Sequence, residues 1–284
     1  MKKVIYYFTG TGNSMRAAEK IALRLKDTEI ISMRNAPEDV PAADADLIGF
    51  VYPVYQWTMP LPVERFVSGL SINPKAYVFV VTTPVFINGY ACETLNELLA
   101  AKGAKLAYAA IVHSVANYVI VYPPFPFPAR TVPRAEKKLN KVADDIAEMR
   151  TKDIPKAGAF VRKKYQTLSK YHKLMPMYDY GFTVNDRCIS CGLCSKLCPC
   201  RNIVISDGKV SFNHQCTHCM ACVVFCPKRA IGYQLPESMM EQLDGNLLDL
   251  TLIKNMGLPQ KRKTYHNPYI TAADIILGRK KFDN

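Results

Sequence analysis

From residue 4 to residue 14 the chain reads Val4-Ile5-Tyr6-Tyr7-Phe8-Thr9-Gly10-Thr11-Gly12-Asn13-Ser14. The apolar half has the pattern of a strand that is buried on both faces, and Asn13 or Ser14 can cap a helix that follows the loop. Backbone N–H groups at the start of a helix attract a phosphate, and the Thr and Ser hydroxyls add neutral donors. This stretch therefore predicts a strand, a phosphate-binding loop and a helix.

The alternation of strand and helix continues through residues 1–150. Apolar runs predict strands at Lys3–Phe8, Glu29–Ser32, Leu47–Tyr52, Tyr77–Thr82 and Leu106–Val112. Amphipathic stretches predict helices at Ser14–Leu25, Pro62–Ser68, Cys92–Lys102 and Val132–Arg150. We therefore expect an α/β domain with a doubly wound, five-stranded parallel sheet of order 2-1-3-4-5 and helices on both faces.

The glycine loop differs from two common nucleotide-binding loops. It lacks the Gly-Lys-[Ser/Thr] of a Walker loop, and Met15 takes the place of the third glycine of a dinucleotide-binding loop. No acidic residue ends the second predicted strand, Ile30-Ile31-Ser32-Met33. Because the loop has no lysine, we expect it to bind one phosphate group through amides and hydroxyls.

The loop is similar to a known one. Thr9-Gly10-Thr11-Gly12-Asn13-Ser14 resembles the phosphate loop of flavodoxins, T-x-T-G-x-[ST]. The resemblance implies that residues 1–150 form a flavodoxin-like domain and that this loop binds the phosphate of FMN. The implied phosphate contacts are Thr9, Gly10, Thr11, Gly12, Asn13 and Ser14.

Two aromatic loops follow the third and fourth predicted strands, at the sheet edge where a flavin would lie. Their candidate ring contacts are Pro53, Val54, Tyr55 and Trp57 in the first loop, and Thr83, Pro84, Phe86, Asn88, Gly89 and Tyr90 in the second. An aromatic side chain from each loop could stack on the ring; ordinary packing over the sheet end is the alternative. The resemblance implies that Asn88-Gly89 offers a backbone group to the flavin N5. Asn117 and Tyr118 follow the fifth strand and are further candidates.

Nine of the ten cysteines lie between Cys188 and Cys226. Cys188–Pro199 and Cys216–Pro227 both read C-x2-C-x2-C-x3-C-P, which is the bacterial two-cluster ferredoxin pattern, in which the fourth cysteine binds the other cluster. We therefore assign one [4Fe–4S] cluster to Cys188, Cys191, Cys194 and Cys226, and a second to Cys216, Cys219, Cys222 and Cys198. The well-separated pairs of a zinc module fit this spacing less well. Clusters bound only by thiolates are expected to be low-potential carriers of one electron each.

Three residues near these patterns receive separate interpretations. Cys92 is expected to be a small buried side chain. Cys200 follows Pro199, but the spacing favours Cys198 as the ligand. His218 lies inside the second run, where a position at the solvent edge is favoured over a hydrogen bond that tunes the cluster.

The second half of the chain is strongly basic, with twenty Lys and Arg against ten Asp and Glu in residues 151–284. We expect a basic linker at 151–182 with a short helix at Phe160–Lys173, a ferredoxin domain at 183–236, and a tail at 237–284 with an amphipathic segment at Met239–Lys254. Four basic residues would offset the cluster charge or dock an acidic redox partner; they are Lys196, Arg201, Lys228 and Arg229. The runs Arg162-Lys163-Lys164 and Lys261-Arg262-Lys263 are expected to be solvated faces, which makes nucleic acid a disfavoured partner.

Taken together, the chain resembles the flavodoxin–ferredoxin fusion proteins of anaerobic bacteria and archaea. The Thr9–Ser14 loop and the two cysteine runs carry this resemblance, and Phe182-x-Val184 and Tyr265-His266-Asn267-Pro268 support it. It implies FMN, two [4Fe–4S] clusters and electron transfer between them, with no catalytic side chain. A flavin-dependent reductase of a quinone, nitro compound or enoate is the alternative. No run of 18 apolar residues and no secretory signal are found, so a cytoplasmic location without membrane contact is expected.

Overall fold

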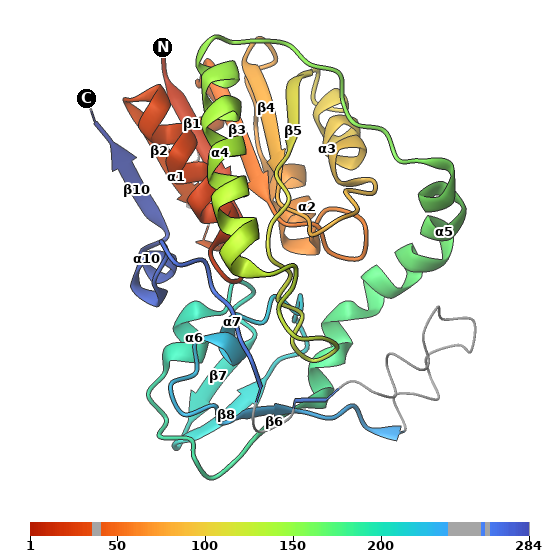
Figure 1. The fold of residues 1–284 in the computed structure, drawn as a ribbon, viewed down its shortest axis with the longest axis vertical. Coiled ribbons are helices and arrows are strands. Elements are labelled where there is room, and N and C mark those ends of the chain that lie inside the picture. Colours follow the sequence, from red (N-terminus) through yellow and green to blue (C-terminus); the bar gives the residue numbers. More distant parts are fainter. Residues whose placement is uncertain (36–40, 238–256, 259–261, 284) are drawn as a thin grey trace.

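A six-stranded sheet is the centre of the computed structural model, which describes residues 1–35, 41–237, 257–258 and 262–283 (Figure 1). Its strands are β1 (Lys3–Tyr7), β2 (Thr28–Ser32), β3 (Leu47–Tyr52), β4 (Tyr77–Thr82), β5 (Leu106–Ile111) and β10 (Arg279–Phe282). They lie in the order β10-β2-β1-β3-β4-β5, and β1 to β5 are parallel. The expected α/β architecture with a mostly parallel sheet is confirmed.

The prediction of five strands was wrong by one. The sixth strand, β10, pairs antiparallel with β2 at the sheet edge, with Arg279 opposite Ile31 and Phe282 opposite Thr28. Its sequence, Arg-Lys-Lys-Phe, has no apolar run, because an edge strand is held by main-chain hydrogen bonds and tolerates charged side chains. The apolar-run criterion could not detect such a strand.

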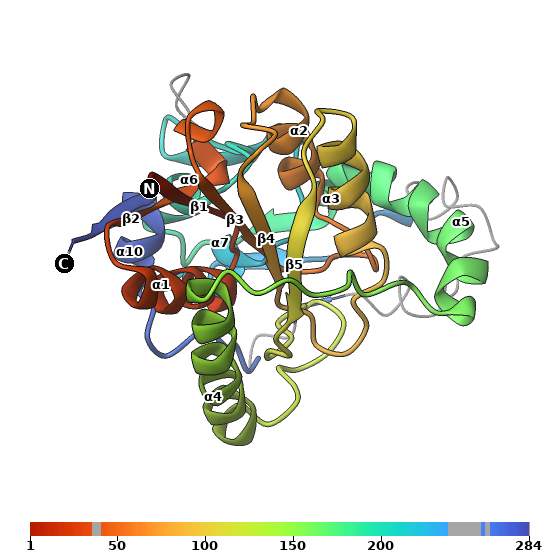
Figure 2. The same cartoon turned by 90° about the horizontal axis from the view of Figure 1, so that it is seen from above.

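Four helices cover the two faces of the sheet (Figure 2). Helices α1 (Asn13–Leu25) and α4 (Pro128–Ala147) pack on one face, and α2 (Leu61–Gly69) and α3 (Ala91–Ala100) on the other. Each face is closed by its own apolar cluster, so the middle strands are buried on both sides. Helix α4 begins four residues before the predicted start, at a proline, which suits a first helical position.

The cysteine-rich part follows two further helical segments, α5 (Ala159–Leu174) and the 3-10 helix η3 (Met175–Gly181). It contains β6 (Phe182–Val184), α6 (Leu193–Leu197), β7 (Ile203–Ser206), β8 (Lys209–Phe212), α7 (Ala221–Val224) and β9 (Ile231–Tyr233). Strand β6 pairs with β9 and β7 with β8, both antiparallel. Two short 3-10 helices, η1 (Met33–Asn35) and η2 (Pro41–Ala43), precede β3. Figure 1 shows the cysteine-rich part below the carboxyl edge of the sheet.

The C-terminal segment returns to the α/β domain. Helix α10 (Ala272–Leu277) has a capping box, in which the Thr271 side chain and the Asp274 backbone and side chain bond reciprocally. The predicted amphipathic segment Met239–Lys254 lies almost wholly outside the described residues. None of the described helices has both the length and the apolar character that a bilayer span requires.

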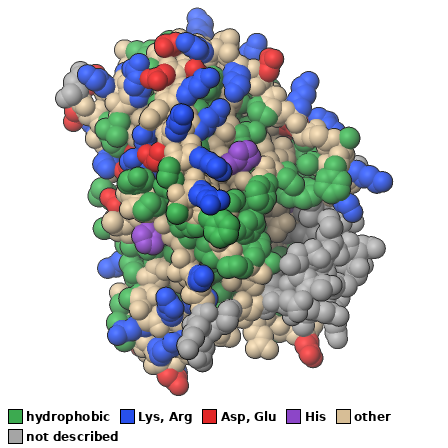
Figure 3. Space-filling model, in the orientation of Figure 1, with side chains coloured by type: hydrophobic (Ala, Val, Ile, Leu, Met, Phe, Trp, Pro, Cys, Tyr) green, Lys and Arg blue, Asp and Glu red, His purple; other side chains and the backbone are tan. Residues whose placement is uncertain are grey.

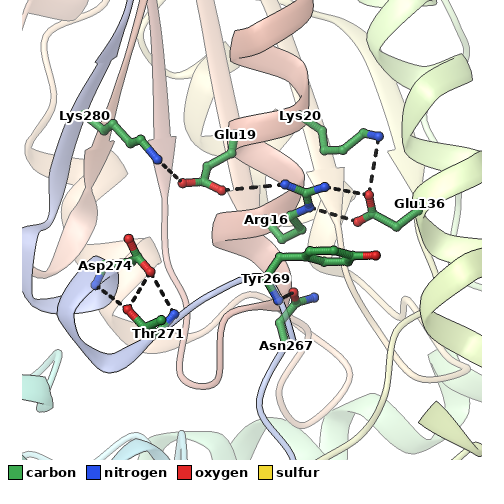
Figure 4. A network of polar contacts seen from close by, with 9 residues as sticks. All are labelled: Arg16, Glu19, Lys20, Glu136, Asn267, Tyr269, Thr271, Asp274 and Lys280. Carbon is green, nitrogen blue, oxygen red and sulfur yellow. Dashed lines mark hydrogen bonds and ion pairs between the residues drawn. The ribbon is translucent and has the colours of Figure 1, made fainter. Parts of the chain in front are cut away.

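A network of charged groups ties α1 to α4 and β10 (Figure 4). Glu136 of α4 accepts two hydrogen bonds from Arg16, at 3.0 and 2.8 Å, and lies 3.3 Å from the Lys20 ammonium. Glu19 accepts a hydrogen bond from Lys280 of β10 at 2.8 Å and lies 4.0 Å from Arg16. All of these side chains except that of Lys280 are mostly shielded from water, so their pairing should stabilise the domain more than surface pairs do.

We expect Glu136→Gln to lower the free energy of unfolding by about 1–3 kcal/mol at neutral pH, because charge-assisted hydrogen bonds are lost. Burial raises the pKa of Glu136, but the hydrogen bond and charge of Arg16 outweigh it, so the pKa is lower than usual. A carboxyl whose pKa is lower in the folded chain than in the unfolded chain stabilises the fold fully above its unfolded pKa. This stabilisation is lost as the pH falls through the pKa of the folded state.

Urea unfolding at pH 7 and at about pH 3 measures this, and the difference between wild type and variant should shrink at the lower pH. Glu97→Gln, at an exposed position on α3, is the matched control and should have little effect. An equal effect of the two substitutions would contradict the interpretation.

Candidate functional site

The glycine loop presents unbonded donors at the start of α1. Gly12, the residue before the helix, has φ 98°, and no side chain caps the helix. The Thr9 hydroxyl accepts a hydrogen bond from the Gly12 N–H at 3.0 Å, which fixes the loop. The hydroxyls of Ser14 and Thr83 lie 2.7 Å apart and are both buried. First-turn N–H groups without a cap, next to buried hydroxyls, form a donor set that fits a phosphate.

A small pocket adjoins the C-terminal end of this loop, at Asn13. Its wall combines α1, the ends of β4 and β5, α4 and the C-terminal segment, and polar groups are supplied by Asn13, Thr83, Ser114, Tyr265 and Asn267. The pocket itself is small, so the case for a ligand rests on the loop. The uncapped first turn of α1 and the hydroxyls beside it fit a phosphate group such as that of FMN.

The two aromatic loops are fixed to each other. Tyr55 and Thr58 exchange backbone hydrogen bonds of 3.0 Å across Gln56 and Trp57, and both of these have positive φ, as in a tight hairpin turn. The Tyr90 N–H donates to the Trp57 carbonyl at 2.8 Å. Gly89 has φ 55°, and a Cβ there would lie 1.8 Å from the same carbonyl oxygen, so only glycine fits.

The predicted ring contacts on these loops have several neighbours. The Trp57 ring lies 5.9 Å from Phe160, and the Tyr90 ring 4.1 Å from Tyr165, so helix α5 covers this side of the loops. Val54 and Tyr55 pack against the apolar cluster of α2 and α3. The predicted linker is thus mainly a 16-residue helix with its own packing partners.

The other candidates near these loops have contacts of their own. Asn88 points inward, accepting a hydrogen bond from Thr82 at 2.5 Å and donating to Cys92 at 3.4 Å. Pro84 accepts a backbone hydrogen bond from Ser114, and Thr83 donates one to Tyr52, while Pro53 is half-buried. Phe86 is exposed, with its ring 5.6 Å from Phe125. Cys92 is fully buried, as predicted, and burial raises the pKa of its thiol to about 11.

The two cysteine runs fold alike, with an offset of 28 residues. Positive φ angles occur at Ser190 and His218, at Gly192 and Met220, and at Arg201 and Arg229. The thiols of Cys198 and Cys226 each accept a hydrogen bond from the backbone N–H four residues later, at 3.2 and 3.3 Å. Helices α6 and α7 begin at equivalent positions. The sequence repeat is thus a structural repeat.

Each predicted cysteine quartet lines a cavity of its own. One pocket is lined by Cys188, Cys191, Cys194 and Cys226, and a second by Cys198, Cys216, Cys219 and Cys222. Each cavity thus takes three cysteines from one run and the last from the other, which is the ligand arrangement of bacterial two-cluster ferredoxins. Cys200 also lines the second cavity, so position alone does not distinguish it from Cys198 as a ligand.

No three His, Cys, Asp or Glu side chains in the described ranges are placed to hold a single metal ion. In a four-iron cluster each cysteine binds a different iron atom, so its thiolates need not converge on one point. The donor set and the two cavities fit such clusters.

His218 is not at the solvent edge, and this expectation was wrong. It is 3% exposed, and its Nδ1 lies 2.9 Å from the Tyr118 hydroxyl. The rings of Tyr178, Phe182 and Tyr233 enclose it. Burial lowers the pKa of His218 to about 4. The aromatic neighbours come from distant parts of the chain, so the local sequence could not reveal them.

The second quartet lies directly against the glycine loop. A Cβ on Gly10 would lie 2.3 Å from the carbonyl oxygen of Cys219, so the two loops touch backbone to backbone. Arg34, which the sequence analysis missed, donates hydrogen bonds to the carbonyls of Ile275 and Lys196. Burial lowers the pKa of Arg34, while the nearby thiols of Cys198 and Cys219 act to raise it. No local motif marks this arginine, because its role depends on the contact between the two parts.

No family model matches the chain, and no curated protein matches it. The solved structures that are similar to part of it include the following three. A flavoprotein of Lactobacillus acidophilus in complex with FMN is 18% identical, covering 39% of this chain and 92% of that one, with a TM-score of 0.33. A Fusobacterium nucleatum flavodoxin bound to FMN is 14% identical (53% and 100% covered, TM-score 0.38), and the Trp repressor binding protein of Bacillus subtilis is 14% identical (50% and 96%, TM-score 0.39). FMN is bound in the Lactobacillus acidophilus and Fusobacterium nucleatum structures, and the low similarity does not extend this property to the present chain.

Proposed function

We propose that this chain transfers electrons between FMN, bound at the Thr9–Ser14 loop, and two [4Fe–4S] clusters. The contact of Gly10 with Cys219 carries the proposal, because it joins the phosphate loop to the second cysteine quartet. FMN supplies one- or two-electron chemistry and each cluster passes one electron at a time, so the chain would link a two-electron reaction to a one-electron one.

The side chains have binding and positioning roles in this proposal. The first-turn amides of α1 and the hydroxyls of Ser14 and Thr83 would hold the phosphate. Backbone N–H groups bonded to the thiols of Cys198, Cys216 and Cys226 would favour the ionised form that binds iron. Arg34 would place a positive charge beside the second quartet, where the four thiolates add negative charge.

The first quartet would exchange electrons with an external partner. Its cavity is lined only by residues of the cysteine-rich part, and Cys191 and Ile189 are exposed. Arg187, Lys228 and Arg229 are exposed around it, which favours an acidic redox protein.

Anaerobic reconstitution with iron and sulfide tests the proposal. We expect about eight iron atoms per chain, paramagnetic signals of two reduced clusters after dithionite, and one FMN. After partial reduction of the clusters, the visible absorbance of the flavin should bleach as electrons reach it. Stoichiometric zinc in place of iron, or flavin that stays oxidised beside reduced clusters, would overturn it.

Exposed apolar side chains favour a second function, the reduction of a small flat acceptor. Phe86, Ile87 and Phe127 are exposed by 60%, 37% and 76%. Figure 3 shows hydrophobic side chains gathered in the middle of the face that it draws. A quinone, nitro compound or enoate could lie on such a surface. Saturable steady-state turnover of one of these would favour a reductase, whereas transfer to protein acceptors alone would favour a carrier.

A further inference from the structure

The C-terminal segment 262–270 passes between the cysteine-rich part and the phosphate loop. Arg262 is buried and donates a hydrogen bond to the Ile231 carbonyl of β9 at 2.7 Å, so this part of the basic run is not the solvated face that was expected. The His266 ring lies 5.1 Å from that of Phe225, the residue that follows α7. One residue later, the Asn267 N–H donates to the Thr11 carbonyl at 2.8 Å.

Two side chains of this segment hold Asn13, the first residue of α1. The amide oxygen of Asn13 accepts hydrogen bonds from the Tyr265 hydroxyl at 3.1 Å and from the Asn267 amide at 3.2 Å. The Asn13 amide nitrogen donates to the Val115 carbonyl at 3.1 Å, so both ends of this side chain are fixed. Burial raises the pKa of Tyr265, which keeps its hydroxyl protonated as a donor.

The segment also closes the space beside the loop. A Cβ on Gly12 would lie 2.9 Å from Ile270 and 3.0 Å from Asn267, so the loop and the segment are in close contact. Tyr265 and Asn267 line the small pocket beside Asn13, and both are less than one-tenth exposed. The segment is anchored beyond this point by Tyr269, whose ring lies 4.3 Å below the Arg16 guanidinium (Figure 4).

We propose that Tyr265 and Asn267 are positioning residues for the phosphate subsite, and that they set its preference for a phosphorylated flavin over an unphosphorylated one. They act through Asn13 and Thr11, holding the first turn of α1 in the geometry in which its N–H groups meet an anion. A site whose donors are fixed in advance loses less free energy on binding. This inference rests on the proposed function, because FMN is its ligand.

The test compares FMN with riboflavin, which lacks the phosphate, by quenching of flavin fluorescence on the full-length chain freed of flavin. Tyr265→Phe removes one hydrogen bond to Asn13 and should weaken FMN binding about fivefold. Asn267→Asp keeps the oxygen that accepts from Tyr269 but turns a negative oxygen toward Asn13, and should weaken FMN binding about tenfold or more. Riboflavin affinity should change less than about twofold in both.

Tyr269→Phe is the matched control, since it removes a hydroxyl four residues away in the same segment and leaves the ring on Arg16. It should leave both affinities unchanged. Because the charge of Asn267→Asp could repel the phosphate directly, the neutral Tyr265→Phe substitution decides the outcome. Equal weakening of both ligands, or unchanged FMN binding in Tyr265→Phe, overturns the inference while the proposed function stands. Failure of the wild type to bind FMN overturns both.

Discussion

Cys198→Ala is expected to lower the iron content of the anaerobically reconstituted chain from about eight atoms to about four. Cys198 lies in the first run but lines the cavity of Cys216, Cys219 and Cys222, so its loss should empty the second cluster site and spare the first. Iron analysis and the paramagnetic spectrum of the reduced protein measure this. The remaining signal should be that of a single cluster, without interaction between two.

Cys200→Ala is the matched control. Cys200 is two residues away and lines the same cavity, but it lies outside the C-x2-C-x2-C-x3-C-P spacing. We expect this variant to keep about eight iron atoms. Full iron content in Cys198→Ala with loss in Cys200→Ala would reverse the assignment of the ligand.

Cys226→Ala makes the reciprocal test. It should empty the cavity of Cys188, Cys191 and Cys194 and leave the other cluster in place. Far-ultraviolet circular dichroism of each variant separates loss of one cluster from loss of the fold. A variant that loses both clusters but keeps its secondary structure would contradict two independent quartets.

Gly10→Ala is expected to separate the phosphate loop from the second cysteine quartet. The added Cβ would lie 2.3 Å from the carbonyl oxygen of Cys219 and 2.8 Å from the Cβ of Cys219. Backbone atoms cannot rotate away from such a contact as the end of a flexible side chain can. Overpacking of this kind costs about 1–3 kcal/mol. The melting temperature should fall by about 2–4 °C for each kcal/mol, and electron exchange between flavin and clusters should slow.

Thermal unfolding and rapid mixing of the reduced protein measure the two effects. Gly69→Ala is the control, because a Cβ at Gly69, the last residue of α2, meets nothing within 4 Å. It should not lower the melting temperature, since alanine favours a helix over glycine. A Gly10→Ala chain as stable as Gly69→Ala, with unchanged electron exchange, would show that the two loops do not touch in solution.

The sequence predicted those features whose cause is local. Continuous apolar runs such as Val4–Phe8 predicted the inner strands, because burial on both faces excludes polar residues. The spacing of the cysteines predicted quartets that the structure places around two separate cavities, and their binding of iron stays a prediction.

Features that depend on contacts between distant segments were missed. Strand β10 is basic, and its place beside β2 follows from the path of the chain rather than from its own pattern. His218 and Arg34 acquire their surroundings from residues far away in the sequence. The sequence could not show which aromatic side chains of the two loops contact a flavin. The rings of Trp57 and Tyr90 pack against helix α5, and such a contact between distant segments leaves no local pattern.

The pairing of β10 with β2 makes the α/β domain discontinuous, and the cysteine-rich part is an insertion between its two pieces. A fragment that ends at residue 150 would therefore lack one strand of the domain's sheet. Such a fragment would have a bare β2 edge, open to pairing with other chains, and would lack Asn267 at the mouth of its own glycine loop. During synthesis β10 emerges only after the cysteine-rich part, so the sheet of the α/β domain is completed last.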